Sequence, residues 1–298
     1  MPNRRITVLL LLGFTLAVAF SLSLPQLRAQ DTLTTVDVPG SVETDLNAIN
    51  TAGFAVGTDC TTDICPPTGA GIAHAFLRRP DGTFKQIKVP QATQSFAYGI
   101  NDSNQVVGWF VDSVGNTHGY MMSGTTFKKI DPPGSTLTNL WAINKADVMV
   151  GTFVGSDGLF HGFIDDAGTF TTFDAPGGSL LTEFTGINNR NQMVGIYFDS
   201  ASVQHGFTLA GTQFKSVDYP GAGVTATDRI NDSGELVGLE GASSAGPFSG
   251  YTRIRGTFAT VTFPGATETR VRGLNNAGVL VGRYTDTANK IHGFMGTP

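Results

Sequence analysis

One dipeptide recurs along the chain at a nearly constant interval, and it constrains the fold more than any other feature. Ile-Asn, or Leu-Asn in the last copy, occurs at intervals of 51, 43, 44, 43 and 44 residues. The copies begin at Ile49, Ile100, Ile143, Ile187, Ile230 and Leu274. A Val-Gly dipeptide follows each copy in the same phase. A period of this length indicates a repeat protein in which each repeat is one supersecondary unit.

Each repeat divides into four short runs separated by turns, and no run has helical length or periodicity. The third residue after the Asn is always Gly, Asn or Asp, the residue types that tolerate a left-handed backbone. These turn residues are Gly53, Asn104, Asp147, Asn191, Gly234 and Gly278. We therefore expect the first two runs to form an antiparallel hairpin. The fourth run ends in a motif such as Asp174–Gly177, whose proline marks the end of a strand.

The two ends of the chain complement each other. The last repeat stops after its third run, and the early segment Thr34–Gly40 (TTVDVPG) matches Thr171–Gly177 (TTFDAPG), a fourth run. Four strands in about 43 residues is the size of one propeller blade. The sequence therefore predicts an all-β fold, a six-bladed β-propeller with four antiparallel strands per blade. The N-terminal strand is expected to close the last blade.

The first 29 residues have the features of a Sec-type signal peptide. Arg4 and Arg5 precede an apolar run that starts at Ile6, and Ala29 offers a small-residue cleavage site. We expect residues 30–298 to form a single propeller domain that is secreted, periplasmic or attached to the cell surface, with no membrane span after cleavage. Acidic residues outnumber Lys and Arg by 24 to 19, which disfavours nucleic acid as a partner.

The two cysteines, Cys60 and Cys65, lie in an insertion that lengthens the first repeat interval. In an oxidising compartment such a pair predicts a disulfide, and closing so short a loop stabilises the fold by about 2 kcal/mol in the chain-entropy model. A metal pair is the weaker alternative, because the spacing is not Cys-x-x-Cys and no second pair completes a zinc site.

All five histidines occupy one repeated position, at the start of the third run. They are His74, His118, His161, His205 and His292. Equivalent positions in a ring of blades stand far apart, so we expect no shared metal site. In three repeats an Asp lies six residues earlier, as Asp112 does for His118, and we expect a hydrogen bond that ties the hairpin loop to the blade. The fifth repeat has Ser249 instead.

The package of motifs (Ile-Asn turn, Val-Gly, His-Gly-Phe, Gly-Thr-Phe and Asp-x-Pro-Gly) resembles the HAF repeat of exported bacterial proteins. That family takes its name from the tripeptide found here at His74–Phe76, and the match covers nearly all of the mature chain. The resemblance implies export and a repeat-built β fold, and it implies no particular chemistry.

If the repeat is scaffold, function should lie where the repeats differ. The position two residues before each Ile of Ile-Asn varies most, and the next position is Gly or Ala in every repeat except the fifth. We predict a ligand-binding site on the propeller axis formed by Asn47, Tyr98, Trp141, Asp228, Arg229 and Arg272. Ordinary variation of the first strands is the alternative. The cysteine-containing insertion from Asp59 to Ala73 is a second candidate site.

The function that follows best is an exported ligand-binding or interaction module for a carbohydrate or an extracellular peptide or protein. A structural component of the envelope or matrix is one alternative, and a propeller-type glycoside hydrolase or lyase is another. The sequence carries no nucleophile elbow, P-loop or zinc-protease motif, so we favour no catalysis, no cofactor and no metal. We expect a monomer.

Overall fold

The computed structural model of the chain describes residues 32–66, 69–177 and 179–296, which contain 24 strands. The predicted signal peptide at residues 1–29 lies outside the described residues. Within the described ranges there is no helix with the length and apolar character needed to cross a membrane. The all-β prediction is confirmed for this part of the chain.

The strands follow one another in units that match the sequence repeats. Unit 1 contains β2 (Glu43–Ile49), β3 (Ala55–Cys60), β4 (Ala73–Arg78) and β5 (Phe84–Gln86). Unit 2 contains β6 (Gln94–Ile100), β7 (Val106–Val111), β8 (Thr117–Ser123) and β9 (Thr126–Ile130). Unit 3 contains β10 (Leu137–Ile143), β11 (Met149–Val154), β12 (Phe160–Asp166) and β13 (Thr169–Phe173).

The second half of the chain repeats this order. Unit 4 contains β14 (Leu181–Ile187), β15 (Gln192–Phe198), β16 (Gln204–Ala210) and β17 (Gln213–Val217). Unit 5 contains β18 (Val224–Ile230), β19 (Leu236–Gly241), β20 (Phe248–Ile254) and β21 (Thr257–Val261). Unit 6 contains β22 (Glu268–Leu274), β23 (Leu280–Thr285) and β24 (Ile291–Gly296), together with β1 (Thr34–Thr35).

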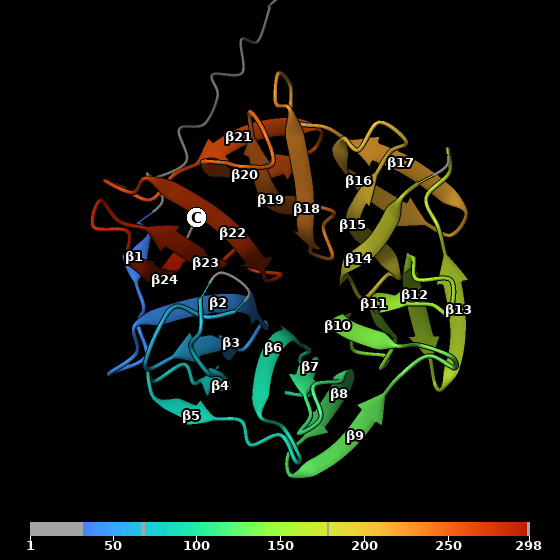
Figure 1. Cartoon of the computed structure of the whole chain (residues 1–298). Coiled ribbons are helices and arrows are strands. Elements are labelled where there is room, and N and C mark those ends of the chain that lie inside the picture. The colour runs from blue at the N-terminus through green and yellow to red at the C-terminus, as the bar shows by residue number, and fades with distance from the viewer. Residues whose placement is uncertain (1–31, 67–68, 178, 297–298) are drawn as a thin grey trace, which may run out of the picture. The chain divides into compact units, whose positions relative to one another are not determined.

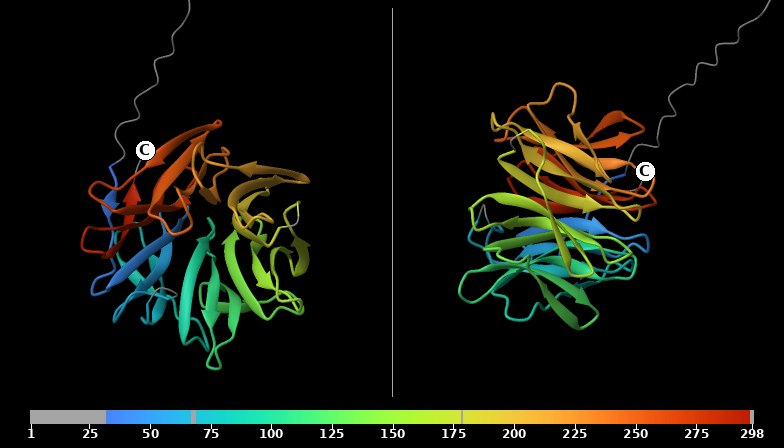
Figure 2. Two further views of the ribbon diagram at one scale, coloured as in Figure 1. Left: turned by 45° about the horizontal axis from the view of Figure 1, so that its top comes forward. Right: turned by 90° about the vertical axis from the view of Figure 1, so that its right-hand side faces the viewer.

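Each unit is an antiparallel sheet in which consecutive strands pair. Four sheets have four strands, and units 3 and 4 are joined into one eight-stranded sheet by a single parallel pair, Phe160 with Leu181. In Figure 1 the first strands of the units lie nearest the middle of the molecule, and Figure 2 shows the same arrangement from two other sides. Each first strand contacts the first strands of both neighbouring units.

The turn after each Ile-Asn has the backbone conformation that the sequence predicts. All six turn residues, Gly53, Asn104, Asp147, Asn191, Gly234 and Gly278, have a positive φ of between 56° and 83°. The turn presents the Asn side chain inward, where its Oδ1 accepts main-chain N–H groups. In unit 4, Asn188 accepts from Arg190 and Gln192 in this way.

The same asparagines join the units to one another. The Nδ2 group of each donates to the main-chain oxygen of the equivalent Asn in the next unit, at 3.0–3.4 Å. The sixth bond runs from Asn275 to Asn50, so the series returns to its start. All six asparagines are at least 95% buried. We call this cycle of side-chain to main-chain hydrogen bonds the asparagine ring.

The core of each unit depends on one aromatic ring and one glycine. Phe207 of the His-Gly-Phe motif is fully buried, and its ring packs over Gly195 of the Val-Gly motif on the adjacent strand. A Cβ atom at Gly195 would clash with this ring and with the carbonyl oxygen of Glu183. The equivalent aromatic side chains of the other units are also buried: Phe76, Tyr120, Phe163, Tyr251 and Phe294. Burying a side chain of this size contributes about 2–3 kcal/mol.

Segments near the two ends of the described residues pair in unit 6, as predicted. β1 pairs antiparallel with β24, with Thr34 opposite Met295 and Thr35 opposite Phe294. The pairing continues through a hydrogen bond from the Val36 amide to the Gly293 oxygen. The N-terminal segment therefore supplies the strand that the last repeat lacks.

We predict that Asn188→Ala lowers the free energy of unfolding by about 2–4 kcal/mol, because it removes several buried hydrogen bonds at once. Asn116→Ala is the control, since Asn116 is exposed and lies in a hairpin loop. Denaturant titration of both variants measures the effect. Equal losses in the two variants would show that the asparagine ring contributes little.

Candidate functional site

Each first strand contains a β-bulge, and the bulged residue is the variable position identified in the sequence. In β2, Leu46 and Ala48 pair with successive residues of β3, so Asn47 is left out of the ladder. The corresponding residues in the other units are Tyr98, Trp141, Thr185, Asp228 and Arg272. A bulge re-aims the side chain of its extra residue. The fold thus places unlike residues at one level around the axis.

The predicted binding residues do come together in one cavity. Asn47, Tyr98, Trp141, Asp228, Arg229 and Arg272 all line it, and so do Glu183 and Thr185. Its volume is about 40 Å³, which is room for one small polar group or a few waters. We call it the axial cavity. A whole sugar ring does not fit inside it, and a role in ligand binding stays a prediction.

Two of the bulged residues serve the scaffold. Asn47 is 98% buried and donates its Nδ2–H to the main-chain oxygen of Ala97 in unit 2. Thr185 donates its hydroxyl to the oxygen of Thr227 in unit 5. Both side chains thus join neighbouring units, which agrees with the alternative of ordinary first-strand variation for these positions. Asp228 and Arg272 instead form an ion pair across units 5 and 6, with an N···O distance of 3.4 Å.

Arg229 joins four units beside the axial cavity, which it also lines. The other units have Gly or Ala at this position, which leaves space for a long side chain to cross the axis. The Arg229 guanidinium donates to the main-chain oxygens of four bulged residues: Tyr98, Trp141, Thr185 and Asp228. It therefore satisfies carbonyl groups from units 2, 3, 4 and 5 that the bulges turn away from the sheet ladders.

Burial and charge shift the ionisation of the cavity groups. Burial and the nearby charge of Asp228 raise the pKa of Glu183 to about 7, against the opposing effect of Arg272. Burial lowers the pKa of Arg229 to about 10, so this side chain stays charged at neutral pH. Glu183 is therefore partly protonated at neutral pH and can donate or accept a hydrogen bond.

One side of the axis is aromatic. The Tyr98 and Trp141 rings meet edge to face at 4.3 Å between centroids, and Trp109 stacks on Phe96 at 3.7 Å. Trp109 and Trp141 are the only tryptophans of the chain. Among the described residues, neither indole N–H has a hydrogen-bond partner. Asp228 Oδ2 and Arg272 Nε are also buried without a partner there.

The predicted disulfide between Cys60 and Cys65 is confirmed and borders this aromatic side. Both cysteines pack with Phe96, and Tyr98 and Trp109 pack against the same cluster. The two candidate sites of the sequence analysis therefore adjoin.

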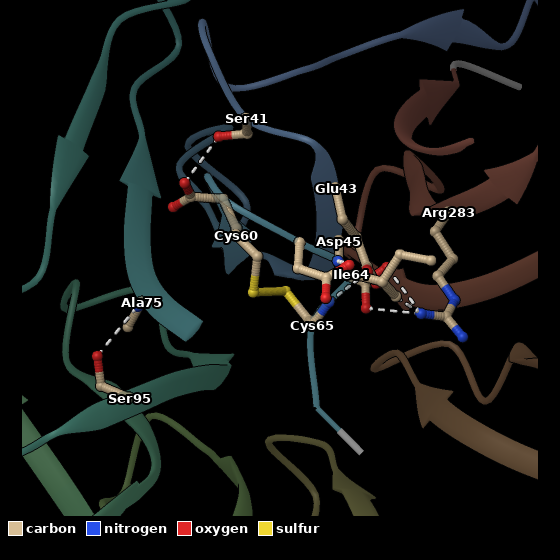
Figure 3. Close-up of a disulfide and its surroundings, with 11 residues drawn as sticks. Ser41, Glu43, Asp45, Cys60, Ile64, Cys65, Ala75, Ser95 and Arg283 are labelled. Carbon is tan, nitrogen blue, oxygen red and sulfur yellow. Dashed lines mark hydrogen bonds and ion pairs between the residues drawn. A yellow bond between two sulfur atoms is a disulfide. The ribbon is translucent and has the colours of Figure 1, made fainter. Parts of the chain in front are cut away.

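Glu43 anchors the insertion, and Arg283 joins Glu43 to Asp45 (Figure 3). Glu43 accepts the amide of Cys65 at 2.7 Å, and Arg283 donates to both Glu43 and Asp45. Burial and the charge of Asp45 raise the pKa of Glu43 to about 6.

The repeated histidines form local pairs with aspartates. His118, His205 and His292 contact the predicted hairpin Asp through Nε2, each at 3.4 Å, and His161 contacts Asp157 at 3.1 Å. Each of these four also places Nδ1 within 2.7–2.8 Å of a second Asp, the one in the Asp-x-Pro-Gly motif. The sequence analysis missed this second partner. Within the described ranges, no group of three or more His, Cys, Asp or Glu side chains has the arrangement of a metal site.

Sequence reasoning missed two other residues: Glu183, which lines the axial cavity, and Trp109, which stacks on Phe96 and Tyr98. Glu183 lies two residues before the bulged Thr185, and strand alternation places it on the same face. Trp109 pairs with Phe96, the residue of β6 at the same level as Glu183. A period-two analysis of the first and second runs could have found both.

We predict that the His–Asp pairs make stability depend on pH. Burial alone would lower the pKa of His161 and His205, but hydrogen bonds and charges of their aspartates raise it above the usual 6.5. The stabilisation of the folded state by these His–Asp pairs is therefore complete below pH 6.5. It is lost as the pH rises through the raised pKa of the histidines. The melting temperature of His161→Gln/His205→Gln should fall less between pH 6 and 8.5 than that of the parent. An equal fall in melting temperature for the variant and the parent would contradict this prediction.

The comparisons with known proteins bear on the fold. The chain matches no protein-family model and no curated protein by sequence. AofleA from Arthrobotrys oligospora superposes with a TM-score of 0.55 at 9% identity, over 89% of this chain and 86% of that one. The fucose-recognising lectin of Aleuria aurantia, a six-bladed β-propeller, has a TM-score of 0.51 at 8% identity, over 88% and 93%.

A third similar structure is the β-propeller domain of the Trilobed protease from Pyrococcus furiosus. It has a TM-score of 0.51 at 8% identity, over 86% of this chain and 94% of that one, and its topology is described as an open velcro. At such low identity the likeness shows the fold alone, which is that of a β-propeller.

Proposed function

We propose that this chain is an exported carbohydrate-binding module of the HAF-repeat type. Its architecture is a six-bladed β-propeller whose last blade is completed by the N-terminal strand. The closed asparagine ring and the pairing of β1 with β24 support this architecture. The likeness to the fucose-recognising lectin of Aleuria aurantia supports the ligand class.

The observation that carries the proposal is the axial cavity and its aromatic border. Flat aromatic surfaces accept the apolar face of a sugar ring, while polar atoms opposite them bind hydroxyl groups. The unpartnered atoms there include both donors, such as the Trp141 indole N–H, and an acceptor, Asp228 Oδ2. A sugar hydroxyl is both a donor and an acceptor, so one such group satisfies both kinds.

The size of the cavity limits what enters it. A volume of about 40 Å³ admits one hydroxyl or hydroxymethyl substituent, and the ring that carries it lies outside, against the aromatic side. Arg229 lines the cavity with its guanidinium already bound to main-chain oxygens such as those of Thr185 and Tyr98. Recognition of the ligand therefore depends on the one substituent that enters the cavity and on stacking of the sugar ring against the aromatic side chains.

Secretion follows from the predicted leader and agrees with the disulfide, since disulfides persist in oxidising compartments. A monomeric protein acting in the periplasm, at the cell surface or in the medium is the state we propose. Its partner is a carbohydrate, and nucleic acid is not expected because the chain carries a net negative charge.

We predict that glycan-array screening of the protein identifies a carbohydrate ligand that quenches or enhances its tryptophan fluorescence. Trp141 lines the axial cavity and Trp109 stacks on Tyr98, which also lines it, so fluorescence reports this site. Trp141→Phe keeps an aromatic ring but removes the indole N–H, and Arg272→Gln removes a charged wall. Each should weaken binding by about tenfold or more, the equivalent of one or two hydrogen bonds.

Arg190→Gln is the matched control, because Arg190 is exposed in the turn of unit 4 and should not affect binding. Binding that survives both axial substitutions unchanged would place the carbohydrate site elsewhere. No binding on the array would favour the structural or protein-partner alternatives.

A second candidate, a glycoside hydrolase, is favoured by one observation. Glu183, with a pKa of about 7, lies beside the carboxylate of Asp228, and such a pair can act as general acid and base. The cavity admits no sugar ring between them, so we predict no release of reducing sugar from any glycan that binds. Hydrolysis that Glu183→Gln abolishes would overturn this and establish the enzyme.

A further inference from the structure

Unit 1 departs from the repeat around His74. In units 2, 3, 4 and 6 the equivalent histidine binds an Asp of the Asp-x-Pro-Gly motif through Nδ1. These aspartates are Asp131, Asp174, Asp218 and Asp37. Unit 1 reads Ile87-Lys88-Val89-Pro90-Gln91 in this region and contains no such carboxylate.

The backbone identifies which residue replaces the aspartate. The hairpin of unit 1 is one residue longer than that of unit 2, so Phe84 corresponds to Phe127. Gln91 has a φ of +65° and takes the place of Gly134, which has a φ of +79°. Counting back from this turn puts Lys88 at the position of Asp131. The carboxylate of the other units is thus exchanged for an ammonium group.

A second exchange lies on the neighbouring strand. In the other His-containing units an aromatic residue sits opposite the histidine and contacts its ring, as Phe110 does for His118 at 5.4 Å. In unit 1 the residue opposite His74 is Asp59. Asp59 is 93% buried and accepts a hydrogen bond from Ser41 at 2.7 Å. His74 is therefore surrounded by different chemistry on two sides.

In unit 1 the main-chain amide has found another acceptor, whereas among the described residues the His74 imidazole lacks a hydrogen-bonded aspartate and has only the nearby charge of Asp59 on the adjacent strand. In units 2 and 6 the amide after the histidine, Gly119 or Gly293, donates to the same aspartate that binds the ring. In unit 1 the corresponding amide of Ala75 donates to Ser95 Oγ at 3.1 Å (Figure 3). Ser95 is 94% buried and holds its hydroxyl at the position of the missing carboxylate oxygen.

Open space lies on both sides of His74. With Lys88 and Ser95 it lines a cavity of about 280 Å³ between units 1 and 2. With Asp59 it lines another of about 640 Å³. The first cavity brings together an imidazole, an ammonium group and a buried hydroxyl, all of which can donate to an anion.

We propose that His74 and Lys88 bind the carboxylate of an acidic sugar in this cavity, where the ligand replaces the aspartate that the other units supply. A carboxylate accepts from the imidazole and the Ser95 hydroxyl while the ammonium group of Lys88 neutralises its charge. The site lies apart from the axial cavity and contains none of its residues. The choice of a sugar as the carrier of the carboxylate rests on the proposed function, whereas carboxylate binding at His74 can hold or fail independently of binding at the axial cavity.

The test follows the imidazole resonances of the five histidines by NMR, each assigned with a single His→Gln variant, during titration with glucuronate at constant pH and ionic strength. Glucose is the uncharged counterpart, and acetate tests whether a carboxylate alone suffices. We expect saturable shifts of His74 with glucuronate and none with glucose, while the other four histidines stay unchanged.

Lys88→Asp rebuilds the arrangement of the other units and should weaken glucuronate binding at least about tenfold, because it places a like charge in the site. Lys85→Asp is the matched control, since it makes the same charge change at an exposed position of β5 outside this cavity. It should change binding by less than about threefold at physiological salt.

Three results would overturn the proposal: no shift of His74 with glucuronate or acetate, equal shifts in all five histidines, or unchanged binding in Lys88→Asp. Saturation by acetate as tight as by glucuronate would assign the site to carboxylates in general and remove the sugar from the proposal. Loss of these shifts in Trp141→Phe would place the acidic sugar at the axial cavity instead.

Discussion

The asparagine ring is the constraint on which the arrangement of the units depends. Each asparagine satisfies its own turn through Oδ1 and reaches the next unit through Nδ2, so hairpin geometry and unit spacing are set by one side chain. Ser, Asp and Gln cannot replace it, because the position needs an acceptor and a donor at a fixed short reach. The turn residue with positive φ is part of the same device, since it brings the amides of the turn to the asparagine oxygen.

The asparagine ring fixes one end of each first strand. The bulged residue a few positions before it can therefore differ from unit to unit. The bulges turn main-chain carbonyl groups toward the axis. Because these groups are buried, they need hydrogen-bond donors. Arg229 supplies them from a position where every other unit is Gly or Ala. The side chain thus connects four units, and its positive charge interacts favourably with Asp228 and Glu183.

Local rules predicted most of the fold. One repeat, or the comparison of the two ends of the sequence, was enough to predict several features. These are the turn residues, the strand ends, the strand that completes unit 6, the disulfide and the hairpin aspartates. The sequence predicted only part of the candidate site. Variation marked the bulged position, but nothing local indicates that Asn47 turns to a neighbouring unit or that Arg229 crosses the axis, because both contacts join residues from different units. The correspondence of Lys88 to the aspartates of the other units was missed because the hairpin of unit 1 is one residue longer than the others.

Units 1 and 5 break the repeat in different ways, and the difference bears on function. Unit 5 has Ser249 and Thr262 where most units have His and Asp, so both partners of the pair are gone and no group needs a replacement. Unit 1 keeps the histidine and exchanges its aspartate for a lysine. Lys88 lines the same cavity as the imidazole and brings a positive charge where the other units have a carboxylate. An anionic ligand between the two side chains accepts from the imidazole and pairs with the ammonium group, so it takes the place of the aspartate that the other units supply.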